Sequence, residues 1–89
     1  MADKRLQELV VELDKTLRAG GAISAEDRAL LERVHRELEI TLASRPSSPE
    51  PPASLRGNLR TALERVQAEH PRLSGLLSAT LDALSDLGV

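Results

Sequence analysis

Residues 59–87 read LRTALERVQAEHPRLSGLLSATLDALSDL, and this stretch decides the fold. Mostly apolar side chains recur in it at alternating intervals of four and three residues. That spacing keeps them on one seam of a helix that packs against another helix. The seam consists of Leu59, Leu63, Val66, His70, Leu73, Leu77, Thr80, Leu84 and Leu87. The pattern predicts an all-α protein built by packing helices against helices.

Pro71 interrupts this stretch without shifting its register, and two interpretations are open. A residue before proline disfavours the helical conformation, so Pro71 could begin a separate helix at its first position. However, His70 is a poor N-cap, and the unbroken heptad register favours one long helix with a kink. We prefer the kinked helix, about 50 Å long over Leu55–Leu87 at 1.5 Å per residue. The broken helix is the alternative.

Two shorter helices precede this stretch. The first is expected over about Lys4–Ala19 and ends at Gly20 and Gly21, because glycine accepts the left-handed conformation of a helix C-cap. Ser24 is expected to cap the second helix, which runs over about Ala25–Ala43. The short turn between the helices predicts an antiparallel helical hairpin over residues 1–43.

A proline-rich segment follows the predicted hairpin. Residues 44–53 read SRPSSPEPPA, and four prolines in this run forbid a helix and favour an extended spacer. A plain linker is the preferred interpretation over a proline-rich docking peptide. Ser54 is expected to cap the next helical segment, so that residues 54–89 form the long leucine-rich helix kinked at Pro71.

The C-terminal part of that helix is apolar on most sides, as buried helices are. Gly75, Ala79 and Ala83 recur every four residues and permit close approach of another helix, and Gly88 lies in the apolar end of the chain. The hairpin is too short to cover the whole long helix. We therefore expect a coiled-coil-like bundle completed by oligomerisation, with a homodimer preferred and a tetramer next. The residues expected to form this interface are Leu59, Leu63, Val66, Leu73, Leu77, Leu81, Leu84 and Leu87.

The composition excludes several classes of function. The chain contains no Phe, Tyr, Trp or Cys and has a formal net charge of −2. Without a basic cluster or an aromatic platform, nucleic acid is not an expected partner. Without cysteine there is no disulfide framework and no thiolate metal site. The N-terminal residues enter a helix pattern directly, with no signal-peptide core, and no stretch is apolar enough to span a bilayer.

Few residues suggest chemistry. Glu32 and His35 have the Glu-x-x-His spacing of di-iron bundles, but such a site needs further inward carboxylates that the sequence does not offer. Ion pairs on the outer face of the helix, such as Arg33 with Glu37, explain this segment better. His70 could act as a proton-linked switch, although a structural histidine bonded to a freed carbonyl is preferred. The sequence predicts no catalytic residue, no metal and no cofactor.

The motifs Ala62-Leu63-Glu64-Arg65-Val66, His70-Pro71-Arg72-Leu73 and Leu84-Ser85-Asp86-Leu87-Gly88-Val89 carry a resemblance. The chain resembles a family of short bacterial helical proteins of unknown function, which end in a His-Pro helix closing on Leu/Met-Gly-Ile/Val. Val66 stands where that family tends to have an aromatic residue, and Val89 replaces a final isoleucine. The resemblance implies a cytoplasmic bacterial helical protein and supplies no activity.

The sequence therefore predicts a small non-enzymatic interaction protein that self-associates through its leucine-rich C-terminal helix. A regulatory or adaptor subunit that presents this helix to a larger enzyme or membrane-associated complex is the alternative. A metal-dependent bundle enzyme is a weaker third hypothesis.

Overall fold

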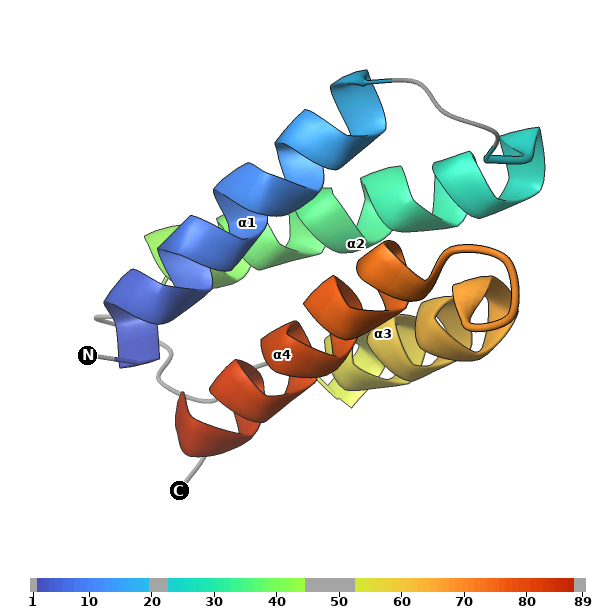
Figure 1. Ribbon diagram of the computed structural model, residues 1–89. Helices are drawn as coiled ribbons and strands as arrows, with labels where there is room; N and C mark the ends of the chain where they lie inside the picture. The colour runs from blue at the N-terminus through green and yellow to red at the C-terminus, as the bar shows by residue number, and fades with distance from the viewer. Residues whose placement is uncertain (1, 20–22, 45–52, 88–89) are drawn as a thin grey trace.

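The computed structural model describes residues 2–19, 23–44 and 53–87, and these residues form four α-helices with no strand among them (Figure 1). The helices are α1 (Ala2–Arg18), α2 (Ala25–Ala43), α3 (Ala53–Val66) and α4 (Pro71–Leu87). The all-α prediction is confirmed. Gly20, Gly21, Gly88 and most of the proline-rich segment lie outside the described residues.

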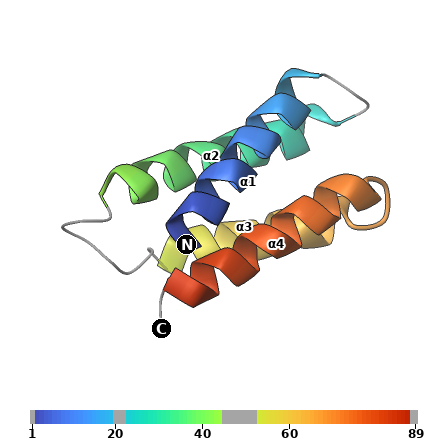
Figure 2. The same cartoon turned by 60° about the vertical axis from the view of Figure 1, so that its left-hand side comes forward.

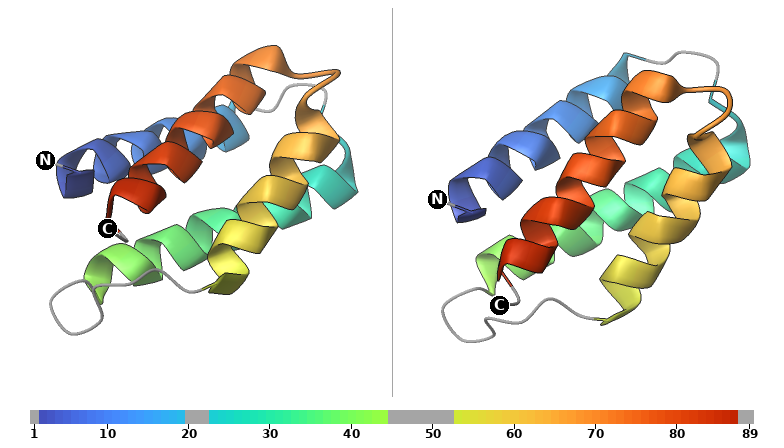
Figure 3. Two further views of the ribbon diagram at one scale, coloured as in Figure 1. Left: turned by 90° about the horizontal axis from the view of Figure 1, so that it is seen from below. Right: turned by 60° about the horizontal axis from the view of Figure 1, so that its bottom comes forward.

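The four helices form a closed ring around one core. Each helix contacts the next one along the chain, and α4 contacts α1. In Figure 1, α1 and α4 lie in front of α2 and α3. Consecutive helices run in opposite directions, so the first turn of α1 lies at the same end of the bundle as the last turn of α4. Figure 2 and Figure 3 show the same order from other sides.

Local signals explain where α2 begins and ends. Ser24 is the N-cap, and its hydroxyl oxygen accepts a hydrogen bond from the backbone N–H of Asp27 at 3.2 Å. Glu26 and Asp27 place negative charge at the positive end of the helix dipole. At the other end, the backbone N–H of Ser44 donates to the carbonyl of Ile40 at 3.0 Å and satisfies one of the last carbonyl groups.

Pro71 begins a separate helix, so the preferred prediction of one kinked helix was wrong and the broken alternative holds. Residues 67–70 form a turn after α3, and α4 folds back along α3 (Figure 3). Pro71 occupies the first helical position, where its missing N–H has no intrahelical partner to lose. The carbonyl of His70 accepts from the N–H of Ser74 at 2.9 Å and so opens α4.

The core lies inside the ring and is built from aliphatic side chains of all four helices. Leucine dominates it, because the chain has no aromatic residue and most of its large apolar side chains are leucine. The buried members are Leu6, Val10, Leu13, Leu17, Leu31, Val34, Leu38, Leu55, Leu59, Ala62, Val66, Leu73, Leu77, Ala83 and Leu84. Two buried threonines, Thr41 and Thr80, satisfy their hydroxyl groups by donating to the carbonyls of Glu37 and Leu76.

A polar contact joins α2 to the start of α3 and corrects two predictions. Glu37 does not lie on a free outer face, because its carboxylate accepts from the side-chain amide of Asn58 at 2.7 Å and from the hydroxyl of Ser54 at 3.4 Å. Arg33 lies near the same carboxylate at 3.7 Å. Since α3 begins at Ala53, Ser54 lies within its first turn and is not its N-cap.

Candidate functional site

The leucine seam of the C-terminal half packs inside a single chain. Leu59, Val66, Leu73, Leu77 and Leu84 are buried in the intramolecular core. Two further members of the predicted interface, Leu63 and Leu81, are partly buried against that core, and the side chain of Leu87 lies outside the described part of the structure. The seam belongs to two antiparallel helices, α3 and α4, which turn it toward α1 and α2.

Because the leucines pack within one chain, the residues that the structure describes do not form the uncovered leucine surface that the sequence predicted. A continuous helix of about 50 Å would have outrun the hairpin, but two shorter helices match the lengths of α1 and α2. The large apolar side chains that remain exposed in the described residues are Val11 at 51% and Ile40 at 58%, one each on α1 and α2. Isolated exposed apolar residues are normal for a monomer surface.

One candidate site lies where α2 begins, α3 ends and α4 starts. Arg65, near the end of α3, donates from Nε to the Asp27 carboxylate at 2.6 Å and from Nη2 to the Glu26 carboxylate at 3.1 Å. Both acids belong to the first turn of α2. Each charge also lies at the end of a helix where the dipole favours it.

These contacts shift the ionisation of the pair. The hydrogen bond from Arg65 is the main reason that the pKa of Asp27 lies below its ordinary value. Desolvation opposes this shift, whereas the Ser24 hydroxyl and the charges of Arg65 and His70 add to it. The same two acids hold the pKa of Arg65 above its ordinary value. The pair is an ion-paired structural link, with both members ionised near neutral pH.

His70 lies beside this link and differs from its predicted role. Its backbone N–H donates to the carbonyl of Val66 at 2.8 Å. Its side-chain Nε2, however, is buried and has no hydrogen-bond partner among the described residues. The imidazole therefore does not bond a freed carbonyl through Nε2. Leaving a buried polar atom without a hydrogen-bond partner costs about 1–3 kcal/mol of folding free energy. The Nε2 atom of His70 therefore does not stabilise the fold by hydrogen bonding.

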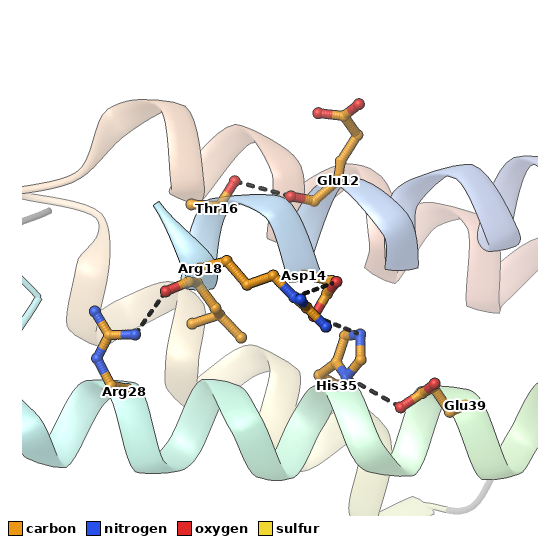
Figure 4. Close-up of polar contacts among 8 residues, drawn as sticks. Glu12, Asp14, Thr16, Arg18, Arg28, His35 and Glu39 are labelled. Atoms are coloured by element: carbon orange, nitrogen blue, oxygen red, sulfur yellow. Dashed lines mark hydrogen bonds and ion pairs between the residues drawn. The ribbon is translucent and has the colours of Figure 1, made fainter. Parts of the chain in front are cut away.

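A second cluster lies in an open groove between α1 and α2 (Figure 4). His35 of α2 lies between two carboxylates, with Nδ1 at 3.2 Å from Glu39 and Nε2 at 3.9 Å from Asp14 of α1. Arg18 pairs with Asp14 at 2.9 Å, and Arg28 donates to the carbonyl of Leu17 at 2.7 Å. The groove thus links α1 to α2 through side chains of both signs and favours neither an anion nor a cation.

The structure gives no support to a di-iron type of site. Glu32 and His35 both line the groove, but His35 already contacts Asp14 and Glu39. Across residues 2–19, 23–44 and 53–87, no three His, Cys, Asp or Glu side chains are arranged to hold a metal ion.

The outer face of α4 is the third candidate, and the sequence identified it only in part. Gly75 and Ser78 are exposed there, Ala79 is partly buried, and Ala83, which shares their spacing, is buried in the core. A Cβ added at Gly75 would meet no atom within 4 Å, so the backbone of α4 is open to solvent at this point. The signal in the sequence was the run of small residues between the leucines.

A family model for a domain of unknown function matches residues 6–89 of the chain. No curated protein and no solved structure matches it. Among the helices described, none has both the length and the hydropathy needed to cross a membrane.

Proposed function

The chain belongs to the DUF4404 family, which is defined by a domain of unknown function, and we propose that it is a non-enzymatic helical interaction protein that self-associates through the outer face of α4. This proposal keeps the helix expected from the sequence but assigns the contact to other residues of it, because its leucine seam packs within one chain.

The observation that carries the proposal is the small size of the side chains on this face. From Gly75 onward the exposed residues of α4 are Gly75, Ser78, Asp82, Ser85 and Asp86, and none is longer than aspartate. The corresponding outer face of α1 carries long charged side chains, namely Lys4, Glu8, Glu12 and Lys15. A face of small side chains lets a second helix approach closely and orders few flexible side chains on binding.

Partly buried Leu76 borders this face on the side of Ala79 and lies at the edge of the core. Contact with a second helix would remove its remaining apolar surface from water. One pair of helices buries less area than the roughly 1,600 Å² of a standard interface. We therefore expect a reversible dimer with a dissociation constant in the micromolar range or weaker, rather than an obligate one.

Molar mass measured against concentration tests this proposal. Sedimentation equilibrium from about 5 μM to 1 mM should show a shift from the 9.6 kDa monomer toward twice that mass. Ser78→Arg places a long charged side chain in the middle of the face and should hold the protein as a monomer.

Ala29→Arg is the matched control, because Ala29 is exposed on α2. It introduces the same charge and length and should leave association unchanged. Circular dichroism verifies that both variants keep their helices. A wild-type protein that stays monomeric throughout this range overturns the proposal, and equal loss of association in both variants rules out α4 as the contact.

The alternative function uses the same surface. The face of α4 would also accept a helix of a different protein, as a regulatory or adaptor subunit requires. This alternative is favoured if the wild-type protein is monomeric but binds a partner protein at defined stoichiometry, and if Ser78→Arg abolishes that binding. The resemblance to bacterial helical proteins favours the cytoplasm in either case, and fractionation of the native cell tests that location.

A further inference from the structure

We propose that two copies pair their α4 helices antiparallel, with Ala79 at the two-fold axis and Arg72 of each copy facing the partner's Asp86. This inference rests on the proposed function, since it names the register of the same contact. The arrangement of charge along α4 carries it.

The charges of α4 are segregated toward its ends. Arg72 is its only basic residue and lies in its first turn, whereas Asp82 and Asp86 lie toward its C-terminal end. All three side chains are exposed. None of them forms an ion pair within the part of the chain that the structure describes. They also stand at the ends of the helix that their signs do not favour, because the dipole favours acids at the N-terminus and bases at the C-terminus.

In an antiparallel pair, two of these unfavourably placed charges, Arg72 and Asp86, each face an opposite charge on the partner helix. Arg72 and Asp86 lie seven residues before and seven residues after Ala79, which is about 10 Å along the helix in each direction. A two-fold axis at Ala79 therefore brings each arginine opposite an aspartate, and the symmetry produces the pair twice. The two helix dipoles also point in opposite directions in this arrangement, which is the favourable orientation for helices that lie side by side.

The parallel arrangement is disfavoured by the same charges. In register, it places Arg72 against the partner's Arg72 and Asp86 against the partner's Asp86. Like charges that face each other across an interface suppress a pairing. The middle of the face holds Gly75, Ser78 and Ala79, so side-chain size permits either direction and charge selects the antiparallel one.

Single cysteines distinguish the two directions, because the chain has no cysteine of its own. In the antiparallel register Ala79→Cys lies at the axis, where its two copies come within the Cα distance of about 7 Å that a disulfide can bridge. Gly75→Cys lies four residues before the axis on the same side of the helix, so its two copies are about 12 Å apart along the helices. We expect oxidation to cross-link Ala79→Cys at least tenfold faster than Gly75→Cys. Ala29→Cys on α2 gives the background of random collisions.

Charge exchange is the second measurement. Arg72→Asp and Asp86→Arg should each weaken the association of the full chain about three- to tenfold by sedimentation, since each breaks two pairs and creates like-charge contacts. The double variant restores opposite charges and should recover the wild-type association.

The outcomes separate the two proposals. Equal cross-linking of Ala79→Cys and Gly75→Cys, in a protein that dimerises, overturns the antiparallel register and leaves self-association through α4 standing. A double variant no better than the single ones overturns the Arg72–Asp86 contact in the same way. Cross-linking of both α4 cysteines no faster than Ala29→Cys, in a dimer, overturns the α4 face itself, and a monomer at all concentrations overturns both proposals.

Discussion

The guanidinium of Arg65 meets the carboxylate of Asp27 at 2.6 Å, although 38 residues separate them along the chain. The contact joins the C-terminal part of α3 to the first turn of α2 and extends to Glu26. It is thus a long-range link at the end of the bundle where the chain turns from α3 into α4.

Replacing Arg65 with methionine should lower the melting temperature at neutral pH, because Asp27 loses its main hydrogen-bond donor. Arg60→Met is the matched control, since Arg60 is exposed on the same helix and forms no ion pair with a described residue. Thermal unfolding followed by circular dichroism measures both. A larger loss in Arg60→Met than in Arg65→Met would contradict the assignment.

The effect of Arg65→Met should depend on pH in one direction. The folded state holds the pKa of Asp27 below its ordinary value, so the stabilisation is present above that ordinary value and is lost as the pH falls through the folded-state pKa. The melting temperatures of wild type and variant should therefore converge below about pH 4. A difference that is undiminished in strong acid would mean that the variant acts through packing.

The amide of Asn58 depends on Glu37. Glu37→Ala leaves that amide without its acceptor and should lower the free energy of unfolding by about 1–2 kcal/mol. A double-mutant cycle with Asn58→Ala should give a coupling energy of about 0.5–1.5 kcal/mol by urea denaturation. Arg33→Ala, at a residue with a 73% exposed side chain, should cost less than about 0.5 kcal/mol.

His70 should tolerate an apolar replacement. Because its Nε2 is buried without a partner, His70→Leu removes an unsatisfied polar atom and should leave the free energy of unfolding unchanged or raise it by up to about 1 kcal/mol. His35→Leu should instead destabilise the protein, since His35 contacts Glu39 and Asp14. A loss in His70→Leu as large as that in His35→Leu would reveal a polar partner for His70.

Pro71→Ala should have a modest effect. Alanine fits the first position of a helix, so the cost is mainly the greater freedom of the unfolded chain, about 0.4–1 kcal/mol. Helical content by circular dichroism should stay level. A clear rise in helicity, together with a large loss of stability, would show that α3 and α4 fuse when the proline is absent.

Local signals in the sequence identified α1 and α2. Ser24 was recognisable as a cap, and the leucines of α1 and α2 recur at helical spacing toward one face. These features depend on residues within a few positions of each other. The all-α fold followed from them without knowledge of the tertiary packing.

The break at Pro71 was missed for a specific physical reason. The turn keeps hydrogen bonds between residues four apart, from the N–H of Gln67 to Leu63, of His70 to Val66 and of Ser74 to His70. The turn between α3 and α4 is therefore short enough that the apolar residues keep their alternating intervals of four and three across it. The same spacing is compatible with one long helix packed against a partner and with two helices that face a shared core.

The polar links were missed because they depend on tertiary packing. The Arg65–Asp27 and Glu37–Asn58 contacts cross 38 and 21 positions of sequence. Charges at one-turn spacing suggested local pairs only, and one of these, Arg33 with Glu37, is present at 3.7 Å. Only the side-by-side placement of α2 and α3 brings these distant side chains together.

The closed ring of helices makes the two halves of the chain complementary fragments. Residues 1–44 contain α1 and α2, and residues 53–89 contain α3 and α4, so each half carries one open apolar face and half of the core. Either half alone is near the size at which a helical core becomes too small to be stable. Together, both the α1–α4 and the α2–α3 contacts would hold them. Separately expressed halves should therefore reassemble without a covalent bond, and the bundle could serve as a small, cysteine-free, split reporter scaffold.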